Sequence, residues 1–437
     1  MADDRWRSRT LDECTTFGSG GTPSKSRSDF WTGTIPWVSA KDLKVFRLYD
    51  AQDHVTAEAI AVGSRIAPAG AILLLVRGMT LHHDVPICVA MRDMAYNQDI
   101  KALVPKSGID AQFLTYWLLS QKSALLSTVD SAGHGTGRLN TDTLRAMTVL
   151  LPPLTEQRAI AAILGALDDK IELNRRMNAT LESMARALFQ SWFVDFDPVR
   201  AKLDGRQPAG MDAATAGLFP DAFQDSELGQ IPRGWSVQPV GEVVGCVGGG
   251  TPSTSEPKYW EGGTHHWTTP KDFSSLQSPI LLDTERKLTD AGISKISSGL
   301  LPAGTLLLSS RAPVGYLAIV AMPVAINQGF IAMKCNERAS NFFMLNWCQT
   351  SMAEIESRAT GTTFAEISKQ NFRPITVVLP PKGLMVAFTA NVAPLYAQVT
   401  ANLRESRTLA TLRDTLLPKL LSGELTVAAA TRLTEHA

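Results

Sequence analysis

The sequence predicts an α+β protein made of two similar strand-rich domains, each followed by one long helix. A set of motifs returns about 230 residues later in the chain, which is too long for a solenoid repeat and indicates a duplicated domain. A heptad spacing of apolar residues follows each copy and predicts the helices. The duplicated motifs are Gly20–Ser24 with Gly249–Ser253, Phe30–Gly33 with Tyr259–Gly262, and Trp37, Lys41 and Asp42 with Trp267, Lys271 and Asp272.

Both copies are expected to pass through the same elements in the same order. Many short strands with Gly and Pro turns predict a mixed, strand-rich domain of roughly 150 residues in each copy. The elements are a Trp-led strand (6–13 and 235–242), the Gly-rich loop, a Trp-bearing strand with the Lys-Asp pair, an apolar strand (70–77 and 304–311), an Asn-Gln pair (97–98 and 327–328), a short amphipathic helix with Phe113 and Trp117 or Phe343 and Trp347, a Gly-rich turn (135–136 and 361–362) and a strand ending in Leu-Pro-Pro (151–153 and 379–381).

After each Leu-Pro-Pro, apolar residues step by four and three, which predicts a helix of about 40 residues and roughly 60 Å. A helix with so long a stripe needs a partner, and the other copy supplies one; docking of each helix on its own domain is the alternative. The polar break falls at the same middle layers of both stripes, and the helices can pair in either direction. The stripes are Ile160, Leu164, Leu167, Ile171, Asn174, Asn178, Leu181, Ala185, Leu188 and Trp192, then Phe388, Val392, Leu395, Val399, Asn402, Ser406, Leu409, Arg413, Leu416 and Leu420.

Two segments next to these helices carry specific expectations. Pro394 lies inside the second stripe, so this helix should start there or kink. The Gly-, Pro- and Ala-rich stretch Asp197–Phe223 predicts a loop or a weakly ordered linker. The patterns divide the chain into domains at 1–153 and 227–381, helical segments at 154–196 and 382–425, a linker at 197–226 and a tail at 426–437.

The composition is that of an ordinary soluble globular protein, with 44% hydrophobic and 19% charged residues. Apolar runs such as Ala71–Val76 have the length of strands, and none approaches the about 20 residues of a membrane span. No signal peptide opens the chain, so we expect a cytoplasmic protein. The scattered cysteines lack the CxxC spacing of a metal or redox site and are expected to be buried free thiols.

The net charge of zero argues against a chain that holds DNA alone through a broad basic surface. It leaves room for local basic patches, or for a complex in which a partner supplies part of the positive charge. The net charge alone therefore does not identify a binding partner or a binding surface.

Several segments resemble enzyme or metal-binding motifs but lack a residue or a geometry that those motifs require. The segment Gly18–Ser26 resembles a phosphate-binding loop, but Ser24 stands where a Gly is required before Lys25. The pairs His82-His83 and His265-His266 would point to opposite faces of an extended strand, which suits solvated loop residues better than a metal site.

Asp272, Glu285 and Lys287 imitate a nuclease pattern, but the first copy has Gln52 and His54 at the last two positions, so chance is the better account. We find no motif of a methyltransferase, a helicase or a serine hydrolase. The sequence predicts no catalytic or metal-binding residues.

The polar residues that both copies retain point to nucleic acid instead. Thr, Ser and the backbone amides of a Gly-rich loop can contact phosphates, Lys and Arg neutralise them, and Arg, Asn and Gln can also read base edges. The alternative is structural, and it is preferred for the Gly and Trp residues, which can set the geometry of the turn. The candidate DNA-binding residues are Thr22, Ser24, Lys25, Lys41, Arg77, Arg138, Thr251, Ser253, Lys271 and Arg311.

With these motifs the chain resembles the specificity subunit of a type I restriction–modification system. The resemblance covers almost the whole chain and rests on the order and spacing of four segments. They are the Gly-rich motif with its Trp and Lys-Asp residues, Leu151–Leu164 (LPPLTEQRAIAAIL), Leu188–Val199 (LFQSWFVDFDPV) and Ser226–Trp235 (SELGQIPRGW).

The resemblance implies two target-recognition domains, each reading one half of a split DNA site through the major groove. It implies that the two helices pair antiparallel as a coiled coil, with a pseudo-two-fold arrangement, and set the spacer between the half-sites. It also implies that two methyltransferase subunits bind the helices and that restriction/translocase subunits join the complex. The chain itself would not be an enzyme, and S-adenosylmethionine, ATP and Mg would belong to the partners.

The chain departs from the family pattern in two places: the second helical region opens with PPKGLMVAF rather than with Glu-Gln-Arg, and it carries Pro394. The alternative function is that of a coiled-coil scaffold with two protein-binding domains.

Antiparallel pairing would bring Asn174 and Asn178 close to Ser406 and Asn402, and we expect this polar layer to set the register of the helices. The helix residues expected to form the seam or to contact partners are Ile160, Leu164, Leu167, Ile171, Asn174, Asn178, Leu181, Leu188, Val392, Leu395, Val399, Asn402, Leu409 and Leu416.

Overall fold

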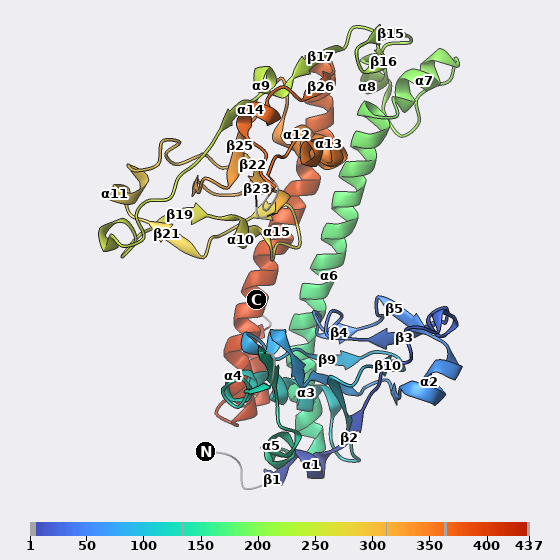
Figure 1. Ribbon diagram of the computed structural model, residues 1–437, viewed down its shortest axis with the longest axis vertical. Coiled ribbons are helices and arrows are strands. Elements are labelled where there is room, and N and C mark those ends of the chain that lie inside the picture. Colours follow the sequence, from blue (N-terminus) through green and yellow to red (C-terminus); the bar gives the residue numbers. More distant parts are fainter. Residues whose placement is uncertain (1–5, 133–134, 312, 362–364, 435–437) are drawn as a thin grey trace. The chain divides into compact units, whose positions relative to one another are not determined.

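The computed structural model describes residues 6–132, 135–311, 313–361 and 365–434 (Figure 1). The chain forms two compact units. Unit 1 comprises Met1–Ile171 and Arg407–Ala437, and unit 2 comprises Glu172–Ser406. Each unit contains one of the two sequence copies together with segments of both long helices.

Unit 1 is built around a five-stranded sheet in the order β2-β11-β7-β9-β4. Its strands are β2 (Thr15–Ser19), β11 (Ile100–Pro105), β7 (Ile72–Leu75), β9 (Ile87–Ala90) and β4 (Arg47–Leu48). The second sheet has the order β5-β3-β10-β6, with β5 (Asp53–Val55), β3 (Ile35–Val38), β10 (Met94–Tyr96) and β6 (Ile66–Ala67). The smaller sheets are β12-β13-β8 (Asp130–Ala132, Thr136–Arg138 and Arg77–Gly78) and β1-β14 (Arg7–Thr10 and Thr148–Leu151).

Unit 2 repeats this topology. Its main sheet has the order β18-β25-β22-β23-β20, with β18 (Gly245–Val247), β25 (Phe330–Lys334), β22 (Leu306–Ser310), β23 (Val314–Val320) and β20 (Ile280–Leu281). The second sheet is β21-β19-β24 (Arg286–Leu288, His265–Thr268 and Val324–Ile326), and β17 (Ser236–Pro239) pairs with β26 (Thr376–Leu379). The order of strands therefore confirms the predicted duplication.

The predicted amphipathic helices are present as α3 (Ala111–Ser120) and α12 (Asn341–Thr350). Asp110 and Ser340 cap them by accepting hydrogen bonds from the backbone amides of Phe113 and Phe343. Further short elements are α1 (Leu11–Cys14), α9 (Val240–Val243), η1 (Ser28–Trp31), η4 (Pro257–Tyr259), α2 (Ala57–Gly63), α11 (Asp290–Ile293), η2 (Met79–His82), α10 (Pro270–Phe273), α4 (Lys122–Ser127), α13 (Met352–Ser357), α5 (Thr141–Ala146) and α14 (Lys369–Phe372).

The long helices are α6 (Leu154–Phe193) and α15 (Lys382–Leu421), each of 40 residues. In unit 1, Leu164 of α6 and Leu416 of α15 belong to one hydrophobic core. In unit 2, Asn174 donates to Ser406, and Asn402 donates to Asn178. The partner's number falls as the α6 number rises, so the two segments within unit 2 run antiparallel.

The expectation that the second helix starts or kinks at Pro394 was wrong as to the start, because α15 begins at Lys382 and continues through this residue. Pro394 is exposed, whereas Val392 and Tyr396 on either side are buried in the core of unit 2. Proline costs one backbone hydrogen bond within a helix. Pro394 lies on the solvent side of α15, and packing of the buried neighbours holds the helix together.

The linker prediction was also wrong in part. The stretch contains α7 (Asp197–Leu203) and α8 (Ala213–Gly217), and it is followed by the hairpin of β15 (Phe223–Ser226) and β16 (Gly229–Pro232). Val199 and Phe219 are buried in the core of unit 2. The composition misled because these few apolar side chains pack against the aromatic residues at the end of α6. A further helix, α16 (Val427–Thr434), packs Ala430 into the core of unit 1.

By length and composition alone, α15 is long and apolar enough to cross a membrane, with a mean hydropathy of 1.3 in its most apolar part. The expectation that nothing in the chain approaches a membrane span was wrong by this measure. Phe388 and Val392 are buried in the core of unit 2, and Leu409 and Leu416 in that of unit 1. These contacts are those of a core helix.

Candidate nucleic-acid interface

The Gly-rich loops of the two units are held by the same contacts. In unit 1 the hydroxyl of Thr22 donates to Gln98 at 2.6 Å, and in unit 2 the hydroxyl of Thr251 donates to Gln328 at 2.6 Å. The indole of Trp37 donates to the carbonyl of Gly21 at 3.0 Å. The backbone of both loops is therefore fixed from two sides before any ligand binds.

The glycine and tryptophan residues have the structural role that the sequence favoured. A Cβ on Gly20 would lie 2.1 Å from the carbonyl oxygen of Tyr96, and one on Gly249 would lie 1.9 Å from that of Ile326. Only glycine lets the loop pack this closely on β10 or β24. The indoles of Trp31 and Trp260 donate to the carbonyls of Ser24 and Ser253 and hold the tip of each loop.

The tips themselves differ between the copies. Ser24 and Ser253 are exposed and lie 2.8 Å from Ser26 and Ser255, respectively. Between them, unit 1 presents the exposed side chain of Lys25, where unit 2 has the exposed Thr254. The loop of unit 1 thus carries a cation that the loop of unit 2 does not.

In each Lys-Asp pair, the aspartate binds backbone amides and the lysine is exposed to solvent. Asp42 is buried and accepts hydrogen bonds from the amides of Ser39 at 2.9 Å and Gln52 at 3.0 Å, and Asp272 binds its own turn in the same way. Asp272 is therefore occupied structurally, which agrees with the reading of the nuclease-like pattern as chance.

Lys41 and Lys271 point outward. Lys41 contacts Asp53 at 2.8 Å and Lys271 contacts Glu285 at 2.8 Å; these hydrogen bonds raise the pKa of both lysines. Exposed ion pairs of this kind contribute little stability, so a phosphate can replace the carboxylate at small cost.

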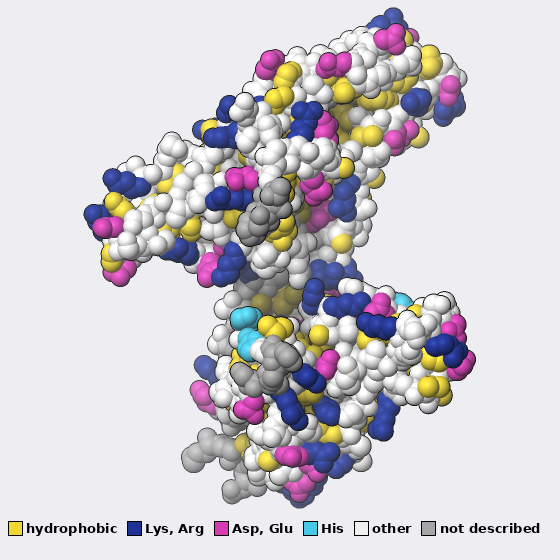
Figure 2. All heavy atoms as spheres, in the orientation of Figure 1, with side chains coloured by type: hydrophobic (Ala, Val, Ile, Leu, Met, Phe, Trp, Pro, Cys, Tyr) yellow, Lys and Arg dark blue, Asp and Glu magenta, His cyan; other side chains and the backbone are white. Residues whose placement is uncertain are grey.

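Arg77 and Arg138 come together across strands β8 and β13, whereas Arg311 meets Glu366 in the equivalent place of unit 2. Thr362 of the predicted Gly-rich turn lies outside the described residues. Figure 2 shows Lys and Arg side chains on the visible face of unit 1, beside histidine side chains. His82 is bound to the carbonyl of Gly135 at 2.7 Å.

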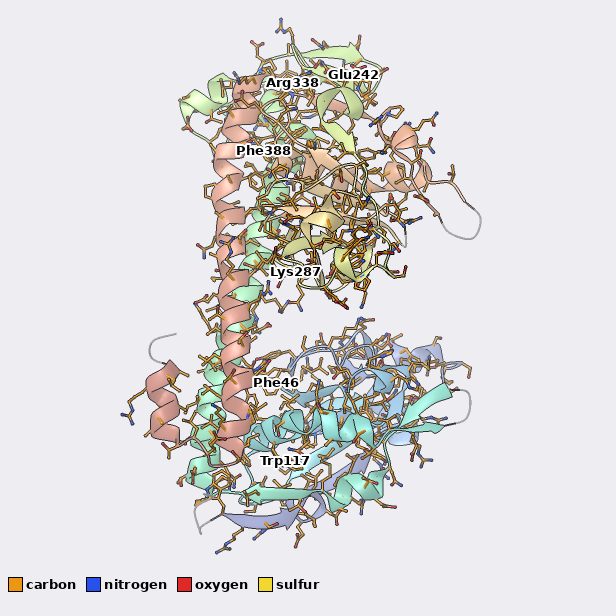
Figure 3. All side chains as sticks on the ribbon, turned by 90° about the vertical axis from the view of Figure 1, so that its left-hand side faces the viewer. Phe46, Trp117, Glu242, Lys287, Arg338 and Phe388 are labelled. Atoms are coloured by element: carbon orange, nitrogen blue, oxygen red, sulfur yellow. The ribbon has the colours of Figure 1, made fainter. Side chains whose placement is uncertain are left out.

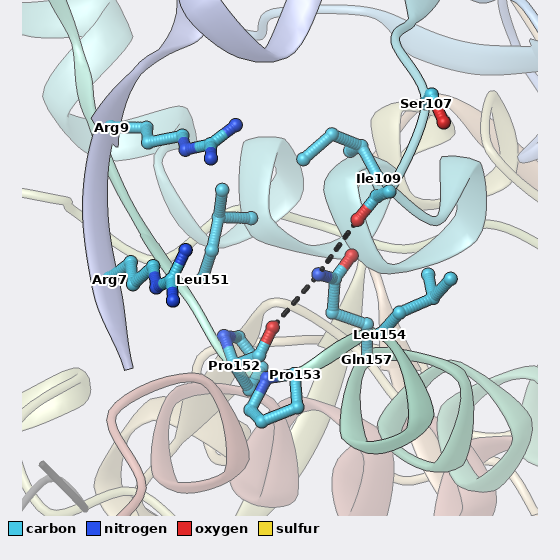
Figure 4. A pocket seen from close by; sticks show the side chains of 10 residues that line it. Arg7, Arg9, Ser107, Ile109, Leu151, Pro152, Pro153, Leu154 and Gln157 are labelled. Carbon is cyan, nitrogen blue, oxygen red and sulfur yellow. Dashed lines mark hydrogen bonds between the residues drawn. The ribbon is translucent and has the colours of Figure 1, made fainter. Parts of the chain in front are cut away.

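Sequence reasoning missed a second basic feature, a cavity of about 460 Å³ in unit 1. Arg7 and Arg9 lie two residues apart on β1, so they share one face of the strand, and Figure 4 shows both side chains beside Leu151. Gln157 closes the floor by donating to the carbonyl of Pro152 at 2.9 Å. In unit 2, Ser236 and Gln238 occupy the matching places. In the sequence, only the two-residue spacing of Arg7 and Arg9 could have indicated this basic feature.

The predicted seam residues of the helices are all buried or half-buried. Within unit 2, Asn174 is fully buried and donates to Glu405 at 2.7 Å and Ser406 at 3.3 Å. Asn402 donates to Asn178 at 2.8 Å. The polar layer expected from the sequence is present.

Sequence reasoning also missed how each strand-rich domain is tied to a long helix. In unit 1, Asp168 of α6 accepts from the hydroxyl of Tyr116 at 2.5 Å and from Arg413 at 2.6 Å. Burial, together with this carboxylate, raises the pKa of Tyr116. Phe46 stacks on Tyr116, and Figure 3 shows Phe46 beside the long helices. Unit 2 also ties its strand-rich domain to a long helix, because Phe342 of α12 stacks on Tyr396 of α15.

Four of the five cysteines are buried and Cys335 is half-buried; all are free thiols, as expected. Burial raises the pKa of Cys246 to about 11. Across the described residues, no group of His, Cys, Asp and Glu side chains has the arrangement of a metal site.

The chain thus contains two copies of one strand-rich domain, each with paired helix segments and an exposed Gly-rich loop held by the same contacts. A family model for the type I restriction modification DNA specificity domain matches residues 3–183 and 232–383. This is more than half of the chain, so the chain belongs to this family of DNA specificity domains.

Relatives extend the similarity over most of the chain. The MjaIX specificity subunit of a type I restriction enzyme from Methanocaldococcus jannaschii is 24% identical over 431 residues, which cover 97% of this chain and 94% of the relative. The HindI specificity subunit from Haemophilus influenzae is 27% identical, with 72% and 77% covered. The fold is similar to that of the S subunit of a type I restriction–modification system from M. genitalium, with a TM-score of 0.54, 15% identity and coverage of 96% and 97%.

Proposed function

We propose that this chain is the DNA-recognition subunit of a type I restriction–modification complex, in which each unit reads one half of a bipartite target. The observation that carries the proposal is the duplicated frame with different tips. Both units hold the Gly-rich loop by the same Thr–Gln and Trp–carbonyl contacts, yet Lys25 in one corresponds to Thr254 in the other. A shared frame with divergent exposed side chains suits two surfaces that read different base sequences.

The paired helices would set the number of base pairs between the half-sites. Because an α-helix has a fixed rise per residue, helix length is a natural ruler. We expect the half-sites to fall about one helical turn of DNA apart, roughly 34–36 Å, as in other two-fold readers.

The chain would act without catalytic residues of its own. Methylation and cleavage would be carried by two methyltransferase subunits and by restriction/translocase subunits, with S-adenosylmethionine, ATP and Mg bound there. The exposed sides of α6 and α15, including Leu173 and Met184, are the expected contacts for the methyltransferase subunits.

The test is methylome sequencing of a methylation-deficient host that expresses the chain with its methyltransferase partners. We expect one split motif, and we expect replacement of residues 1–153 by the equivalent domain of a relative to change one half of that motif only. An unsplit motif, or a change in both halves, would contradict the proposal.

If the chain were instead a scaffold with two protein-binding domains, its complex would bind proteins but not DNA. Binding of duplex DNA by the assembled complex, weakening steeply as salt is raised, separates the two because neutralisation of phosphates releases counterions. A complex that forms normally but binds no duplex would favour the scaffold.

A further inference from the structure

A ladder of three charged residues crosses the small sheet β12-β13-β8 of unit 1. Asp130 is the register partner of Arg138, and Arg138 is the register partner of Arg77. Residues directly opposite on antiparallel strands present their side chains on the same face of a sheet. All three residues are exposed.

Among the residues that the structure describes, none neutralises the guanidinium group of Arg77 or Arg138. Within the described ranges, no ion pair or hydrogen bond of the Arg77 or Arg138 side chain is found, and Asp130 is not within ion-pair distance of either. Like charges directly opposite in a sheet are destabilising. Such a pair is stabilised when an anion binds between the two groups.

Unit 2 provides an internal comparison at the same place in the fold. Its ladder is Thr360, Glu366 and Arg311, joined by two isolated bridges. Arg311 lies 3.7 Å from the carboxylate of Glu366. One acid and two bases in unit 1 thus become one acid and one base in unit 2, and only the ladder of unit 1 carries a net positive charge.

A phosphodiester fits the ladder of unit 1 better than a base edge does. Guanidinium groups bind phosphate oxygens in parallel pairs, and two of them can share one phosphate. A guanine edge, in contrast, offers its two acceptors to a single arginine. Beside the ladder, His82 of η2 is bound to the carbonyl of Gly135, the residue directly before β13.

We propose that Arg77 and Arg138 together bind one backbone phosphate of the DNA beside the half-site read by unit 1, while the equivalent arginine of unit 2 is neutralised by Glu366. This inference rests on the proposed DNA-recognition function. It adds that the two half-sites are held with unequal electrostatic strength.

The experiment measures the salt dependence of target-DNA binding by the assembled methyltransferase complex. Arg138→Glu puts an acid opposite Arg77, as Glu366 lies opposite Arg311, and Glu366→Arg puts a base opposite Arg311, as Arg138 lies opposite Arg77. The slope of log K against log salt is negative, and loss of one phosphate contact lowers its magnitude by about 0.9. We expect this decrease for Arg138→Glu and a similar increase for Glu366→Arg. Between 50 and 200 mM salt, one contact corresponds to an about three- to fourfold change in affinity.

Arg92→Glu is the matched control, because Arg92 is exposed on the turn after β9, at the end of the β7–β9 hairpin remote from β8. It should leave the slope within error. If Arg138→Glu does not fold, Glu366→Arg still tests the inference through a gain.

Three outcomes discriminate. If the wild-type complex binds its target and both variants leave the slope unchanged, the inference is wrong and the proposed function still stands. An altered preferred sequence with an unchanged slope would assign Arg138 to base reading and also overturn it. A wild-type complex without salt-dependent target binding would instead contradict the proposed function.

Discussion

At the scale of single residues, the two copies separate side chains that build the loop from side chains available to a ligand. Gly20 and Trp37 are committed to the backbone of the Gly-rich loop, whereas Lys25 and Arg77 are exposed. The sequence identified all four, because both copies or their differences marked them. It did not show that Lys41 has a carboxylate partner, because Asp53 lies on a neighbouring strand, whereas Arg77 has none in the part of the chain that the structure describes.

Gly20→Ala should destabilise unit 1. The new Cβ would meet the backbone carbonyl of Tyr96 at 2.1 Å, so the loop would have to move off β10. Overpacking of this kind costs about 1–3 kcal/mol. Gly250→Ala is the control, since nothing lies within 4 Å of its added Cβ. Denaturant unfolding of the two variants checks this, and equal stability of both would contradict the close approach.

Glu172 should make α6 sensitive to acid. Hydrogen bonds from Arg175, and then Arg176, lower the pKa of Glu172 to about 2 from an ordinary value of 4.5. A lowered pKa contributes stability that is present above about pH 4.5 and is lost as the pH falls towards 2. The contribution is small because the side chains are partly exposed.

Glu172→Gln should therefore flatten the decrease of the unfolding midpoint between pH 5 and pH 3. Glu227→Gln is a control, because Glu227 is exposed and has no ion pair within the part of the chain that the structure describes. Identical acid sensitivity of wild type and Glu172→Gln would count against this assignment.

At the scale of elements, the long helices are held by an apolar seam that a polar layer interrupts. Asn174, Asn178 and Asn402 are all at least 95% buried, and the side-chain oxygen of Asn174 has no hydrogen-bond partner among the described residues. Burying a polar group without all its partners lowers stability. The layer is therefore expected to contribute specificity of register rather than stability.

Replacing Asn174 and Asn402 together with leucine should raise the melting temperature and relax the spacing between half-sites. An apolar layer packs equally well in shifted registers, so methylation of targets with a spacer one base pair longer or shorter should increase. Val399→Ile, a conservative change in the same seam, should do neither. Unchanged discrimination between spacers in the double variant would refute the register role.

The same comparison of elements explains where pattern reading failed. The second helix was expected to start or kink at Pro394, but the position of this residue on the exposed side of α15 lets the buried residues on either side hold the helix together. The residues 197–223 were expected to be a loop from their Gly, Pro and Ala content. Val199 and Phe219 instead pack on the aromatic end of α6, a contact that composition does not reveal.

At the scale of the whole molecule, the prediction concerns the number of base pairs that the two long helices set between the half-sites. The chain passes between its two units at residues 171–172 on α6 and 406–407 on α15. Inserting one heptad at both junctions keeps the seam in phase and adds about 10 Å of helix. Since base pairs are stacked about 3.4 Å apart, the preferred spacer should lengthen by about three base pairs.

Methylome sequencing of the insertion variant reads the new spacer directly. The same insertion in α15 alone takes the two seams out of step and should lower stability without giving a new defined spacer. A double-insertion variant that still methylates only the original spacing would refute the ruler.

The sequence by itself determined the duplication, the strand-rich domains, the long helices and their polar layer. Those features repeat in order, or follow the period of a helix, and periodicity is a local property that survives without coordinates. The tertiary structure alone decided that Arg138 faces Arg77 while Glu366 faces Arg311, and that Asp168 binds Tyr116 and Arg413. These partners are far apart in the chain, and strand register and helix packing bring them together. Their charges therefore acquire a meaning only after the backbone has folded.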